Sequence, residues 1–460
     1  MIPVGTARES RWSEVRTHGR AGKRQAERAL CTLASAIVTR LRRVDWLVVW
    51  IVVCAKIIVL ATIAIAYHVF PFLSWTYYTA LHYPSSEGIS LQTAYKTWDA
   101  QHFIFLSQVG YHPAGPSNDY YPLLPALIHL VALPLRSPLA AGLLISNSCS
   151  LVGVYYLYLF VLRMFQDRRT AVLSVLLMVA FPTSFFLSLV YSESLFLMLA
   201  ICFFYYLYAN NYPVCSICAF LLALARPLGV LIIVPWLIFH VAAGMNTRRT
   251  TLPTRASWRG SRRYVRSSIP RRRKSPPQLV PHTFGARSRQ RPAYMLAPLV
   301  GYAVYLLNML FTTGNALSAF TQEQSSIGAW HVSDILRPDL LVSNFFLPFT
   351  VQLPDFGFTA PTASPLDRVF FLLFLVGLPL VALETDIVLL SFYVLLGSVP
   401  ILGSFMSYSR YLMPAFPLYV AFAKLASTTQ RRFAVAIWLL VGFAGSLILV
   451  SRHALGYWVG

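Results

Sequence analysis

The chain has 460 residues, of which 57% are hydrophobic and 12% charged, whereas roughly a quarter of the residues in an ordinary soluble domain are charged. This composition excludes a water-soluble globular domain as the main body of the protein. The formal net charge of +22 is gathered in two blocks rather than spread among aromatic residues along a groove, which argues against nucleic acid as a partner. Repeated apolar runs of about 16 to 25 residues match the helix length that crosses about 30 Å of hydrocarbon. We therefore predict an all-α, polytopic transmembrane helical bundle.

The two basic blocks predict the orientation of the chain in its membrane. Residues 1–43 carry ten Lys and Arg residues against three acidic ones. Residues 246–292 carry fourteen Lys and Arg residues and no acidic residue. Under the positive-inside rule both blocks are cytoplasmic, where they also reach anionic lipid headgroups. The second block is rich in Arg, Ser and Pro, so it is predicted to be disordered. The apolar run after the first block is too long for the core of a signal peptide.

The apolar runs predict about eleven membrane spans, which places both basic blocks on one side. One run, 214–243, is interrupted by Arg226-Pro227, which marks either a kink or a turn between two short helices. A single crossing there would put the second basic block outside, so we predict the turn. The predicted spans are 44–67, 138–162, 171–190, 194–209, 214–225, 228–243, 294–312, 367–382, 387–405, 411–425 and 433–450.

This arrangement predicts four parts of the chain and two external loops. The short, proline-rich apolar run 121–135 favours an interfacial or re-entrant helix within the first external loop. The parts are a basic cytoplasmic tail at 1–43, an N-terminal transmembrane catalytic module at 44–245 with the large external loop 68–137, a basic cytoplasmic loop at 246–292, and a C-terminal transmembrane module at 293–460 with the external loop 313–366.

Neither the cysteines nor the histidines predict a metal site. The six cysteines lie mostly inside or beside apolar runs, which does not indicate a disulfide framework. Cys215-x-x-Cys218 has apolar surroundings and no second ligand pair, so a zinc or redox site is disfavoured. His102, His112 and His331 show no paired spacing, which disfavours a metal site built from protein ligands alone. A divalent metal ion that bridges a donor phosphate stays open as a cofactor.

The motif Trp98-Asp99-x-x-His102-Phe103 in the first external loop is the sharpest local feature. An acid beside a membrane surface, flanked by aromatic rings that stack on sugars, suits glycosyl transfer, in which a carboxylate takes the proton of an attacking hydroxyl. Asp99 is thus a candidate catalytic base, and Trp98 and His102 are candidate substrate-binding residues. The alternative is that Asp99 caps a short interfacial helix and Trp98 belongs to the aromatic belt.

A second feature, Tyr191-Ser192-Glu193-Ser194, interrupts two apolar runs near the external end of the bundle. Ionisable residues at such depth usually face a cavity, so Glu193 is a candidate to assist Asp99 or to bind a sugar hydroxyl, with Tyr191 beside the substrate. The alternative is a helix N-terminus, with Ser192 as its cap and Glu193 favoured by the macrodipole.

Arg226 is a lone guanidinium in an apolar stretch. A lipid-linked donor presents a phosphate near the headgroup layer, and Arg can hold it bidentately while the sugar leaves. The alternative is an arginine whose head reaches up to the interface.

The second external loop carries Gln322 and Trp330, and a later turn carries Arg410 and Tyr411. Amides and aromatic rings suit carbohydrate recognition, and Arg410 is a second candidate phosphate ligand. Taken singly, each residue is also typical of a loop or an aromatic belt.

The ordered set of motifs resembles the PIG-V family, the second mannosyltransferase of GPI-anchor assembly and its prokaryotic relatives. The resemblance spans about residues 44–425. It is carried by Trp98-Asp99-x-x-His102-Phe103, Gly110-Tyr111, Tyr121-Pro122-Leu123-Leu124-Pro125, Tyr191-Ser192-Glu193-Ser194, Arg226-Pro227-x-Gly229 and Arg410-Tyr411-x-x-Pro414.

The resemblance implies a GT-C type fold with Asp99 as the base in the first external loop. It also implies a polyprenyl- or dolichyl-phosphate sugar donor, usually of mannose, a lipid or glycan acceptor, and an inverting reaction. The basic segments 1–43 and 246–292 depart from the eukaryotic members and no residue indicates a GPI acceptor, so the chain looks more like a prokaryotic member. A cell membrane is then favoured over the endoplasmic reticulum.

Two other functions stay open at the level of the sequence. A transporter or flippase for a lipid-linked intermediate would also place Glu193 and Arg226 inside the membrane, although paired inverted halves are not evident. An accessory subunit that stabilises another membrane enzyme is the third reading. Substitution of Asp99 distinguishes glycosyl transfer from these two functions, because a catalytic base is indispensable to transfer whereas a helix cap is replaceable.

Overall fold

The computed structural model describes residues 44–251, 292–319, 365–402, 405, 407–429 and 432–459, together with 337, 339, 345–346, 350–353 and 358–361. The chain divides into two compact units, Met1–Trp50 and Ile51–Gly460. The second unit contains all the residues of the candidate site. Helix α2 (Trp46–Val69) crosses the division.

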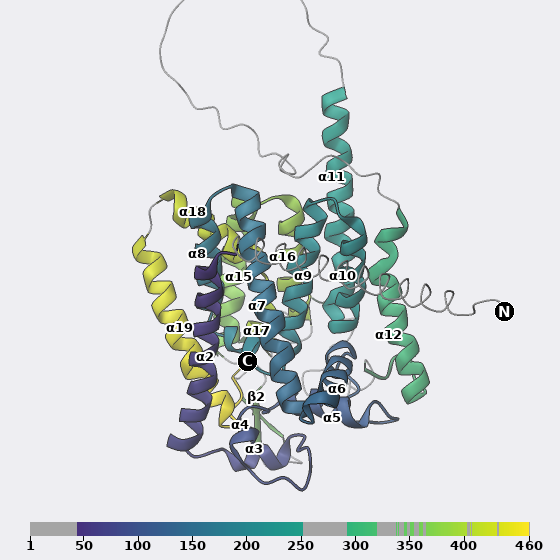
Figure 1. The fold of residues 1–460 in the computed structure, drawn as a ribbon, viewed down its shortest axis with the longest axis vertical. Coiled ribbons are helices and arrows are strands. Elements are labelled where there is room, and N and C mark those ends of the chain that lie inside the picture. The colour runs from purple at the N-terminus through teal and green to yellow at the C-terminus, as the bar shows by residue number, and fades with distance from the viewer. Residues whose placement is uncertain are drawn as a thin grey trace, which may run out of the picture. The chain divides into compact units, whose positions relative to one another are not determined.

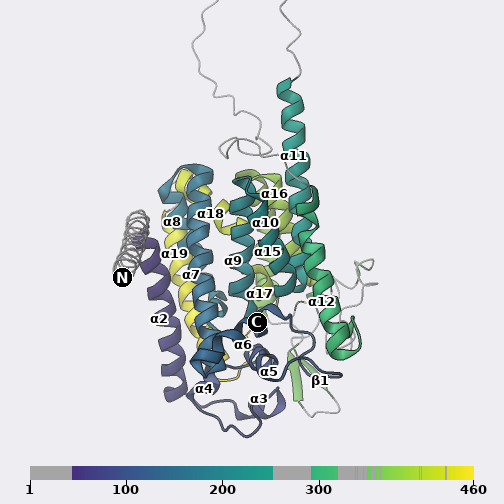
Figure 2. The same cartoon turned by 45° about the vertical axis from the view of Figure 1, so that its right-hand side comes forward.

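The second unit is helical, with its long helices side by side and the short helices α3 to α6 at one end of the bundle (Figures 1 and 2). The helices after α2 are α3 (Ser74–Thr79), α4 (Leu91–Ala94), α5 (Asp99–Val109), α6 (Leu123–Leu135), α7 (Pro138–Phe165), α8 (Arg168–Val179), η1 (Ser184–Ser188), α9 (Ser192–Tyr208), α10 (Tyr212–Ala225), η2 (Pro227–Ile232), α11 (Ile233–Thr251), η3 (Pro292–Leu296), α12 (Ala297–Thr313), α15 (Pro365–Glu384), α16 (Ile387–Ser398), η5 (Pro400–Leu402), α17 (Tyr408–Leu412), α18 (Pro417–Thr429) and α19 (Arg432–Ala454).

Five stretches of helix in the described residues are long and apolar enough to cross a membrane, as expected for a multi-pass membrane protein. They are Trp46–Val69, Pro138–Phe165, Ala293–Thr313, Pro365–Glu384 and Phe433–Ala454. Five further apolar helices are shorter, among them α6, which forms where the sequence predicted a short helix in the first external loop. The expected number of eleven spans is therefore not established.

Three predicted spans are not continuous helices, and proline explains each break. The run 171–190 is α8 followed, after Pro182, by the short η1, and the run 387–405 is α16 and η5, separated before Pro400. The run 411–425 begins in α17 and resumes as α18 beyond Pro414. Proline disfavours helical conformation in the residue before it and cannot donate a backbone hydrogen bond, so these helices stop inside the bundle.

Polar caps set the starts of several helices at the bundle's ends. The Ser137 hydroxyl accepts from the amide of Ala140 at the start of α7. Asp167 accepts from two amides at the start of α8, and Asp386 does the same for α16 while also accepting from the Tyr208 hydroxyl at 2.5 Å. Because these carboxylates satisfy amides that the helix leaves unpaired, short loops suffice between long helices.

Helix α7 packs closely against α9 and against the residues just before it, because glycines of α7 face these contacts. A Cβ added to Gly153 would lie 2.9 Å from Cα of Met198, and one added to Gly142 would lie 2.5 Å from a methyl carbon of Val190. Close approach at glycine is typical of packing between membrane helices. Lys56 of α2 donates to the carbonyl of Leu187 at 2.9 Å, which also holds η1 in place. These contacts fix the start of α9.

The chain turns at Arg226, as the sequence predicted. Arg226 is extended, with φ −157° and ψ 156°, and η2 follows directly. A Cβ added to Gly229 would lie 1.9 Å from the carbonyl oxygen of Leu222. In a continuing helix, residues seven apart would be separated by about 10 Å. The contact thus requires a reversal of the chain, and Arg226 remains at the same end of the bundle as the start of α9.

Two elements differ from the sequence prediction. Helix α11 continues to Thr251, so residues 246–251 of the segment expected to be disordered are helical, because extending an existing helix costs far less than nucleating one. Strands β1 (Thr350–Leu353) and β2 (Phe358–Pro361) form an antiparallel pair within the segment predicted to be the second external loop, with Thr350 opposite Pro361. The all-α prediction missed this hairpin, whose Thr, Val and Phe residues favour extended backbone.

The turn after Arg226 gives a prediction about stability. In Gly229→Ala the added methyl meets backbone, which cannot rotate away, so we expect a loss of about 1–3 kcal/mol or more of stability. Thermal unfolding of the purified protein in detergent measures it. Gly88→Ala is the matched control, because a Cβ at Gly88 meets no atom within 4 Å. Equal melting temperatures for the two variants would contradict the tight turn.

Candidate active site

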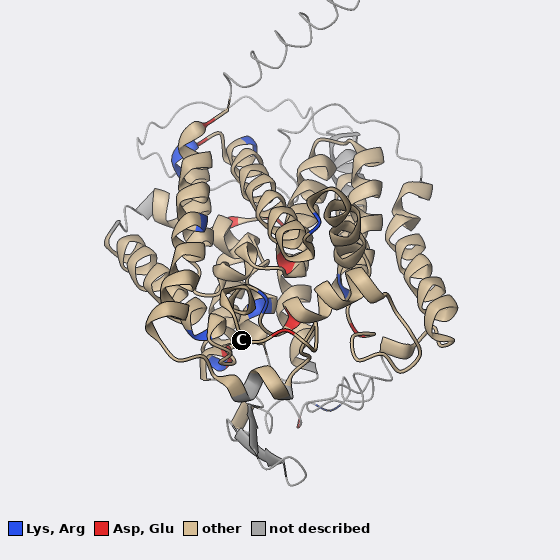
Figure 3. Cartoon of the chain, turned by 60° about the horizontal axis from the view of Figure 1, so that its bottom comes forward, with Lys and Arg blue, Asp and Glu red and all other residues tan. Residues whose placement is uncertain are grey.

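Four charged residues from separate helix ends meet at one place. Asp99 is the first residue of α5, Glu193 is the second of α9, Arg226 follows α10 and Arg410 lies in α17. Figure 3, which looks onto the end of the bundle that carries α3 to α6, shows acidic and basic positions close together near its centre. Each residue stands where a helix begins, ends or is short, so their gathering depends on the breaks described above.

The four side chains form a chain of ion pairs, here called the charge cluster. Arg410 Nη2 lies 2.6 Å from Asp99 Oδ2 and 2.8 Å from Glu193 Oε1, and Arg410 Nε donates to the same Glu193 oxygen at 3.0 Å. Arg226 Nη1 lies 3.2 Å from Glu193 Oε1. Two cations thus balance two anions, with Arg410 between the carboxylates and Glu193 between the guanidinium groups.

The cluster is buried, but unevenly. The Glu193 side chain has no exposed surface, the two arginine side chains are 9% exposed, and the Asp99 side chain is 17% exposed. Charges in such surroundings are tolerated only when paired, and removing one partner of a buried pair typically costs about 3–5 kcal/mol. Glu193 therefore anchors the cluster from within, whereas Asp99 presents an oxygen to the open side.

Aromatic rings and backbone contacts fix the orientation of Arg410. Its guanidinium lies 4.9 Å from the ring centres of both Phe186 and Tyr191. The backbone of Ser409 is held on both sides, because its amide donates to Asp367 Oδ1 at 2.9 Å and its carbonyl accepts from the Thr183 hydroxyl at 3.1 Å. Cation–π contacts and fixed backbone make Arg410 a rigid element of the site.

Arg226 and Tyr191 are held in a similar way. The Arg226 guanidinium lies 5.0 Å from the ring centre of Tyr411. The Tyr191 hydroxyl donates to the carbonyl of Thr97 at 3.1 Å and lies 3.0 Å from Nε2 of His453. Tyr191 therefore joins the start of α9 to the residues just before Asp99 and to the end of α19.

Beside the cluster is a cavity of about 390 Å³, here called the Asp99 cavity. Its volume falls in the range of about 300–1,000 Å³ that is usual for small-molecule sites. The wall combines the open side of the charge cluster with many aromatic rings. It is formed by Ala80, Leu81, Trp98, Asp99, His102, Phe103, Asp119, Tyr120, Tyr121, Ser192, Ala225, Arg226, Pro227, Ser407, Arg410, Tyr411 and Trp458.

The Asp99 carboxyl is ionised in this environment. Burial raises its pKa, but the adjacent Arg410 guanidinium outweighs burial, and His102 and a hydrogen bond from the Tyr120 hydroxyl to Oδ1 at 3.1 Å add to the effect. The pKa of Asp99 is therefore below its ordinary value. One oxygen of the carboxylate is paired with Arg410, and the other accepts a hydrogen bond from the neutral Tyr120 hydroxyl. A ligand hydroxyl that takes the place of Tyr120 can therefore give its proton to Asp99.

His102 contributes a neutral ring to the wall. Its imidazole is stacked on Tyr120, with ring centres 4.5 Å apart and planes at 15°, and its Nδ1 lies 2.8 Å from the Ser117 hydroxyl. Burial lowers the pKa of His102 to about 4, and the nearby Asp99 carboxylate only partly opposes this. At neutral pH the ring is therefore uncharged, and it holds Tyr120 against Asp99.

The structure brings together eight of the ten residues predicted for the site. Six of these line the Asp99 cavity, while Glu193 and Tyr191 stand behind its wall and contact Arg410. The other two, Gln322 and Trp330, lie outside the described residues. The six are Trp98, Asp99, His102, Arg226, Arg410 and Tyr411.

The helix-cap and interface alternatives describe these residues only in part, because Asp99 and Glu193 do lie in the first turn of a helix, where the macrodipole favours an acid. Trp98, not Asp99, precedes α5 as its N-cap, and the oxygens of Asp99 accept from side chains. Tyr191, not Ser192, is the N-cap of α9 and makes no side-chain cap. Arg226 is 8% exposed and paired with Glu193, so its head does not reach out to a surface.

Sequence reasoning did not predict the other residues of the cavity wall as site residues, among them Asp119, Tyr120 and Trp458. Asp119 and Tyr120 directly precede the Tyr121-Pro122 motif, so a longer motif would have included them. Trp458 follows the last helix without any nearby charge pattern, and only the folded chain brings it to the cavity. Among the described residues no group of three or more His, Cys, Asp or Glu side chains gathers as a metal site.

Comparison with known proteins found no matching family model and no matching curated protein. Among solved structures, the chain is distantly similar to the oligosaccharyltransferase of Archaeoglobus fulgidus. The apo form has 14% sequence identity and a TM-score of 0.41, over 89% of this chain and 56% of that one. The same enzyme, AglB, in complex with an inhibitory peptide and a dolichol-phosphate, has 14% sequence identity and a TM-score of 0.38, over 87% of this chain and 56% of that one. The chain thus spans just over half the length of these proteins.

The low pKa of His102 predicts a pH dependence of stability. The unfolded chain binds a proton on this ring below about pH 6.5, whereas the folded chain does so only below about pH 4, so folding loses stability as the pH falls through this window. We expect His102→Gln to flatten the fall in melting temperature between pH 6.5 and 4 in detergent. His112→Gln, a histidine that does not line the cavity, is the control. An unchanged slope in His102→Gln would show that the ring is not buried in the neutral form.

Proposed function

We propose that this protein is a membrane glycosyltransferase of the GT-C type. It transfers a hexose, which the sequence resemblance favours as mannose, from a polyprenyl- or dolichyl-phosphate donor to a hydroxyl of a lipid or glycan acceptor. The observation that carries the proposal is an ionised carboxylate, Asp99, on the wall of a sugar-sized cavity that two buried guanidinium groups also line. A base, a phosphate-binding pair and aromatic walls are the groups that this reaction requires.

The two arginines are the proposed ligands of the donor phosphate. Within the described part of the chain, Nη1 of Arg226 makes no hydrogen bond of good geometry, although it is buried on the cavity side of Glu193. A phosphodiester carries one negative charge and gains a second when its bond to the sugar breaks. Guanidinium groups that already face the cavity stabilise this developing charge without having to reorganise.

Asp99 is the proposed general base. The acceptor oxygen attacks the anomeric carbon opposite the phosphate, a new carbon–oxygen bond forms as the bond to the lipid phosphate breaks, and the proton of the acceptor hydroxyl passes to Asp99. One displacement inverts the anomeric configuration and forms no sugar–enzyme intermediate. The Arg410 contact keeps Asp99 ionised but weakens it as a base, so a phosphate that draws Arg410 away makes Asp99 more basic when the donor is bound.

Glu193 has a positioning role in this proposal. It does not line the cavity, and one of its oxygens contacts both arginines. It therefore holds the two guanidinium groups at a fixed separation and balances their charge before the donor arrives.

The proposed reaction takes place on the non-cytoplasmic face of a cell membrane, or of the endoplasmic reticulum membrane in a eukaryotic cell. The basic segments 1–43 and 246–292 support this orientation by the positive-inside rule. Arg226 directly precedes η2 at the start of α11, whereas residues 246–251, which begin the second basic segment, form the other end of that helix. This arrangement supports the proposed orientation.

Asp99→Asn tests the proposal directly. Asn keeps the shape and an acceptor oxygen, and Glu193 still pairs with Arg410, so we expect the variant to fold. Transfer should fall by about 10²–10⁴-fold because the base is lost. Membranes that contain equal amounts of each protein are assayed with radiolabelled polyprenyl-phosphate mannose.

Asp167→Asn is the matched control, since this carboxylate caps α8 and is not part of the cavity wall. Equal transfer by wild type and Asp99→Asn would remove Asp99 as the base. The wild-type protein is instead a transporter if it transfers no sugar from mannose, glucose or galactose donors but moves a labelled lipid-linked sugar across the membrane of vesicles that contain it.

Arg226→Ala tests the phosphate assignment. Loss of this guanidinium should raise the KM for the lipid-phosphate donor by tenfold or more, with the acceptor KM within about twofold, because one charge-assisted contact contributes about 1.5–3 kcal/mol. Steady-state transfer at varied donor and acceptor concentrations measures both constants. An effect on the acceptor KM alone would contradict the assignment. Arg163→Ala, at a position outside the cavity wall, is the control.

A further inference from the structure

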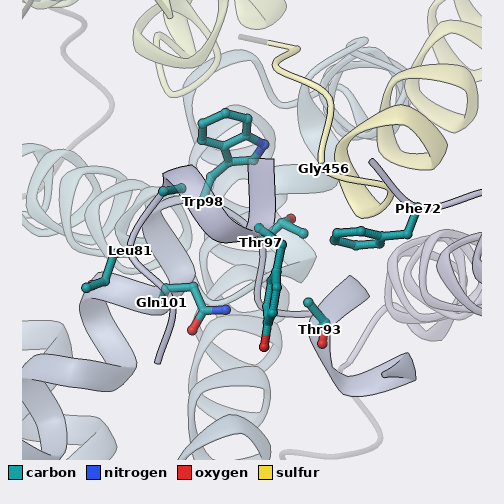
Figure 4. A pocket seen from close by; sticks show the side chains of 9 residues that line it. Phe72, Leu81, Thr93, Thr97, Trp98, Gln101 and Gly456 are labelled. Atoms are coloured by element: carbon teal, nitrogen blue, oxygen red, sulfur yellow. The ribbon is translucent and has the colours of Figure 1, made fainter. Parts of the chain in front are cut away.

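The segment after α19 forms part of the Asp99 cavity. Trp458 lines this cavity and packs against Trp98, with ring centres 4.9 Å apart and planes at 85°. The segment is anchored, because the carbonyl of Leu455 accepts from the amide of Leu73 at 2.8 Å and the amide of Tyr457 donates to the carbonyl of Arg452 at 3.0 Å. Figure 4 shows Gly456 on the segment of chain that passes beside the indole of Trp98. Two indole rings at right angles therefore form a corner of the wall, here called the tryptophan corner.

The tryptophan corner has hydrogen-bonding capacity that the protein leaves unused. In the described residues, neither indole N–H has a hydrogen-bond partner, although both nitrogen atoms are buried. Trp98 also lines a second, smaller pocket, together with Thr97 and Gln101 (Figure 4). Their side chains are 6% and 3% exposed, and Thr97 Oγ1 and Gln101 Oε1 also have no partner among the residues that the structure describes. Buried polar groups without partners are costly, which indicates that a ligand or water satisfies them.

The groups of the tryptophan corner differ in chemistry from those of the charge cluster. Arg226 contacts Glu193, Glu193 contacts Arg410, and Arg410 contacts Asp99, so the charged groups follow one another up to Asp99. Trp98 comes next in sequence and contacts Trp458. The two tryptophans of the corner thus offer uncharged aromatic faces and N–H donors, whereas the oxygens of Thr97 and Gln101 belong to the smaller pocket. A neutral ring with apolar C–H faces and many hydroxyl groups fits this combination, since its faces stack on indole and its hydroxyls donate and accept.

We propose that the tryptophan corner binds a sugar ring of the acceptor. This inference rests on the proposed function, because the attacking hydroxyl must approach opposite the phosphate and must touch the base. With the phosphate at Arg226 and Arg410, the acceptor must take another part of the cavity, and Trp458 and Trp98, which directly precedes Asp99, line the same cavity. The acceptor is therefore a glycan or a glycolipid, and Trp458 selects for its sugar ring.

Trp458→Ala and Trp458→Phe test the inference. Wild type and variants transfer radiolabelled mannose from polyprenyl-phosphate mannose to octyl α-D-mannopyranoside, with both concentrations varied. We expect Trp458→Ala to raise the KM for octyl mannoside at least tenfold and to leave the donor KM within twofold. Trp458→Phe keeps an aromatic face and loses the N–H, so it should give an intermediate rise. Trp438→Phe is the matched control, because this α19 tryptophan donates to the carbonyl of Leu177 and does not line the cavity.

A binding measurement separates failure of the inference from failure of the proposed function. Saturation-transfer NMR with methyl α-D-mannopyranoside on the purified protein needs no turnover, and we expect its signal to be lost in Trp458→Ala and kept in Trp438→Phe. An equal signal in both variants, or a rise in the donor KM instead of the acceptor KM, would overturn the acceptor assignment while transfer itself stands. A signal that depends on Trp458 in a protein that transfers no sugar would leave a sugar-binding corner and remove the glycosyltransferase proposal.

Discussion

The site depends on the position of Arg410, a buried guanidinium shared by two carboxylates. Its contacts with Asp99 and Glu193 join α5, α9 and α17, and Glu193 extends the contact to Arg226 at the end of α10. None of these charges is stable alone in a helical interior, because each would lose its hydration without compensation. The fold therefore has to bring four helix ends together, and the cavity beside them has the partly exposed carboxylate of Asp99 in its wall.

Broken helices make this arrangement compatible with an apolar bundle. A continuous span satisfies its backbone internally and offers few charged positions in its interior. Where proline or an extended residue ends a helix early, as before Pro182, at Arg226-Pro227 and before Pro414, the chain can place polar side chains inside without exposing them to lipid. Glycine allows the close contacts that hold these breaks, as at Gly229 against Leu222. The same prolines that shorten the predicted spans therefore create the site.

The cavity has a division of chemistry that suits the transfer of a sugar between two different partners. Arg226 and Arg410 make one part cationic, while Trp98 and Trp458 make another part aromatic and neutral. Asp99 contacts Arg410 and directly follows Trp98 in the chain, and the uncharged ring of His102 adds no competing charge beside it. Under the proposed function, the wall itself orients the donor and the acceptor about Asp99, because an anion and a neutral ring are each favoured in only one part.

The sequence by itself determined the helical membrane class, the turn at Arg226 and six of the residues that line the cavity. Those predictions rest on local physics: apolar length, charge placement and the cost of an ionisable residue in an apolar run. It missed the early ends of α8 and α16 and the hairpin at 350–361, where the proline breaks and local strand pairing outweigh overall hydropathy. Only the tertiary structure decided that Glu193 stands behind the wall and that Trp458 belongs to it, because contacts between residues so distant in sequence leave no local pattern, and packing alone brings them together.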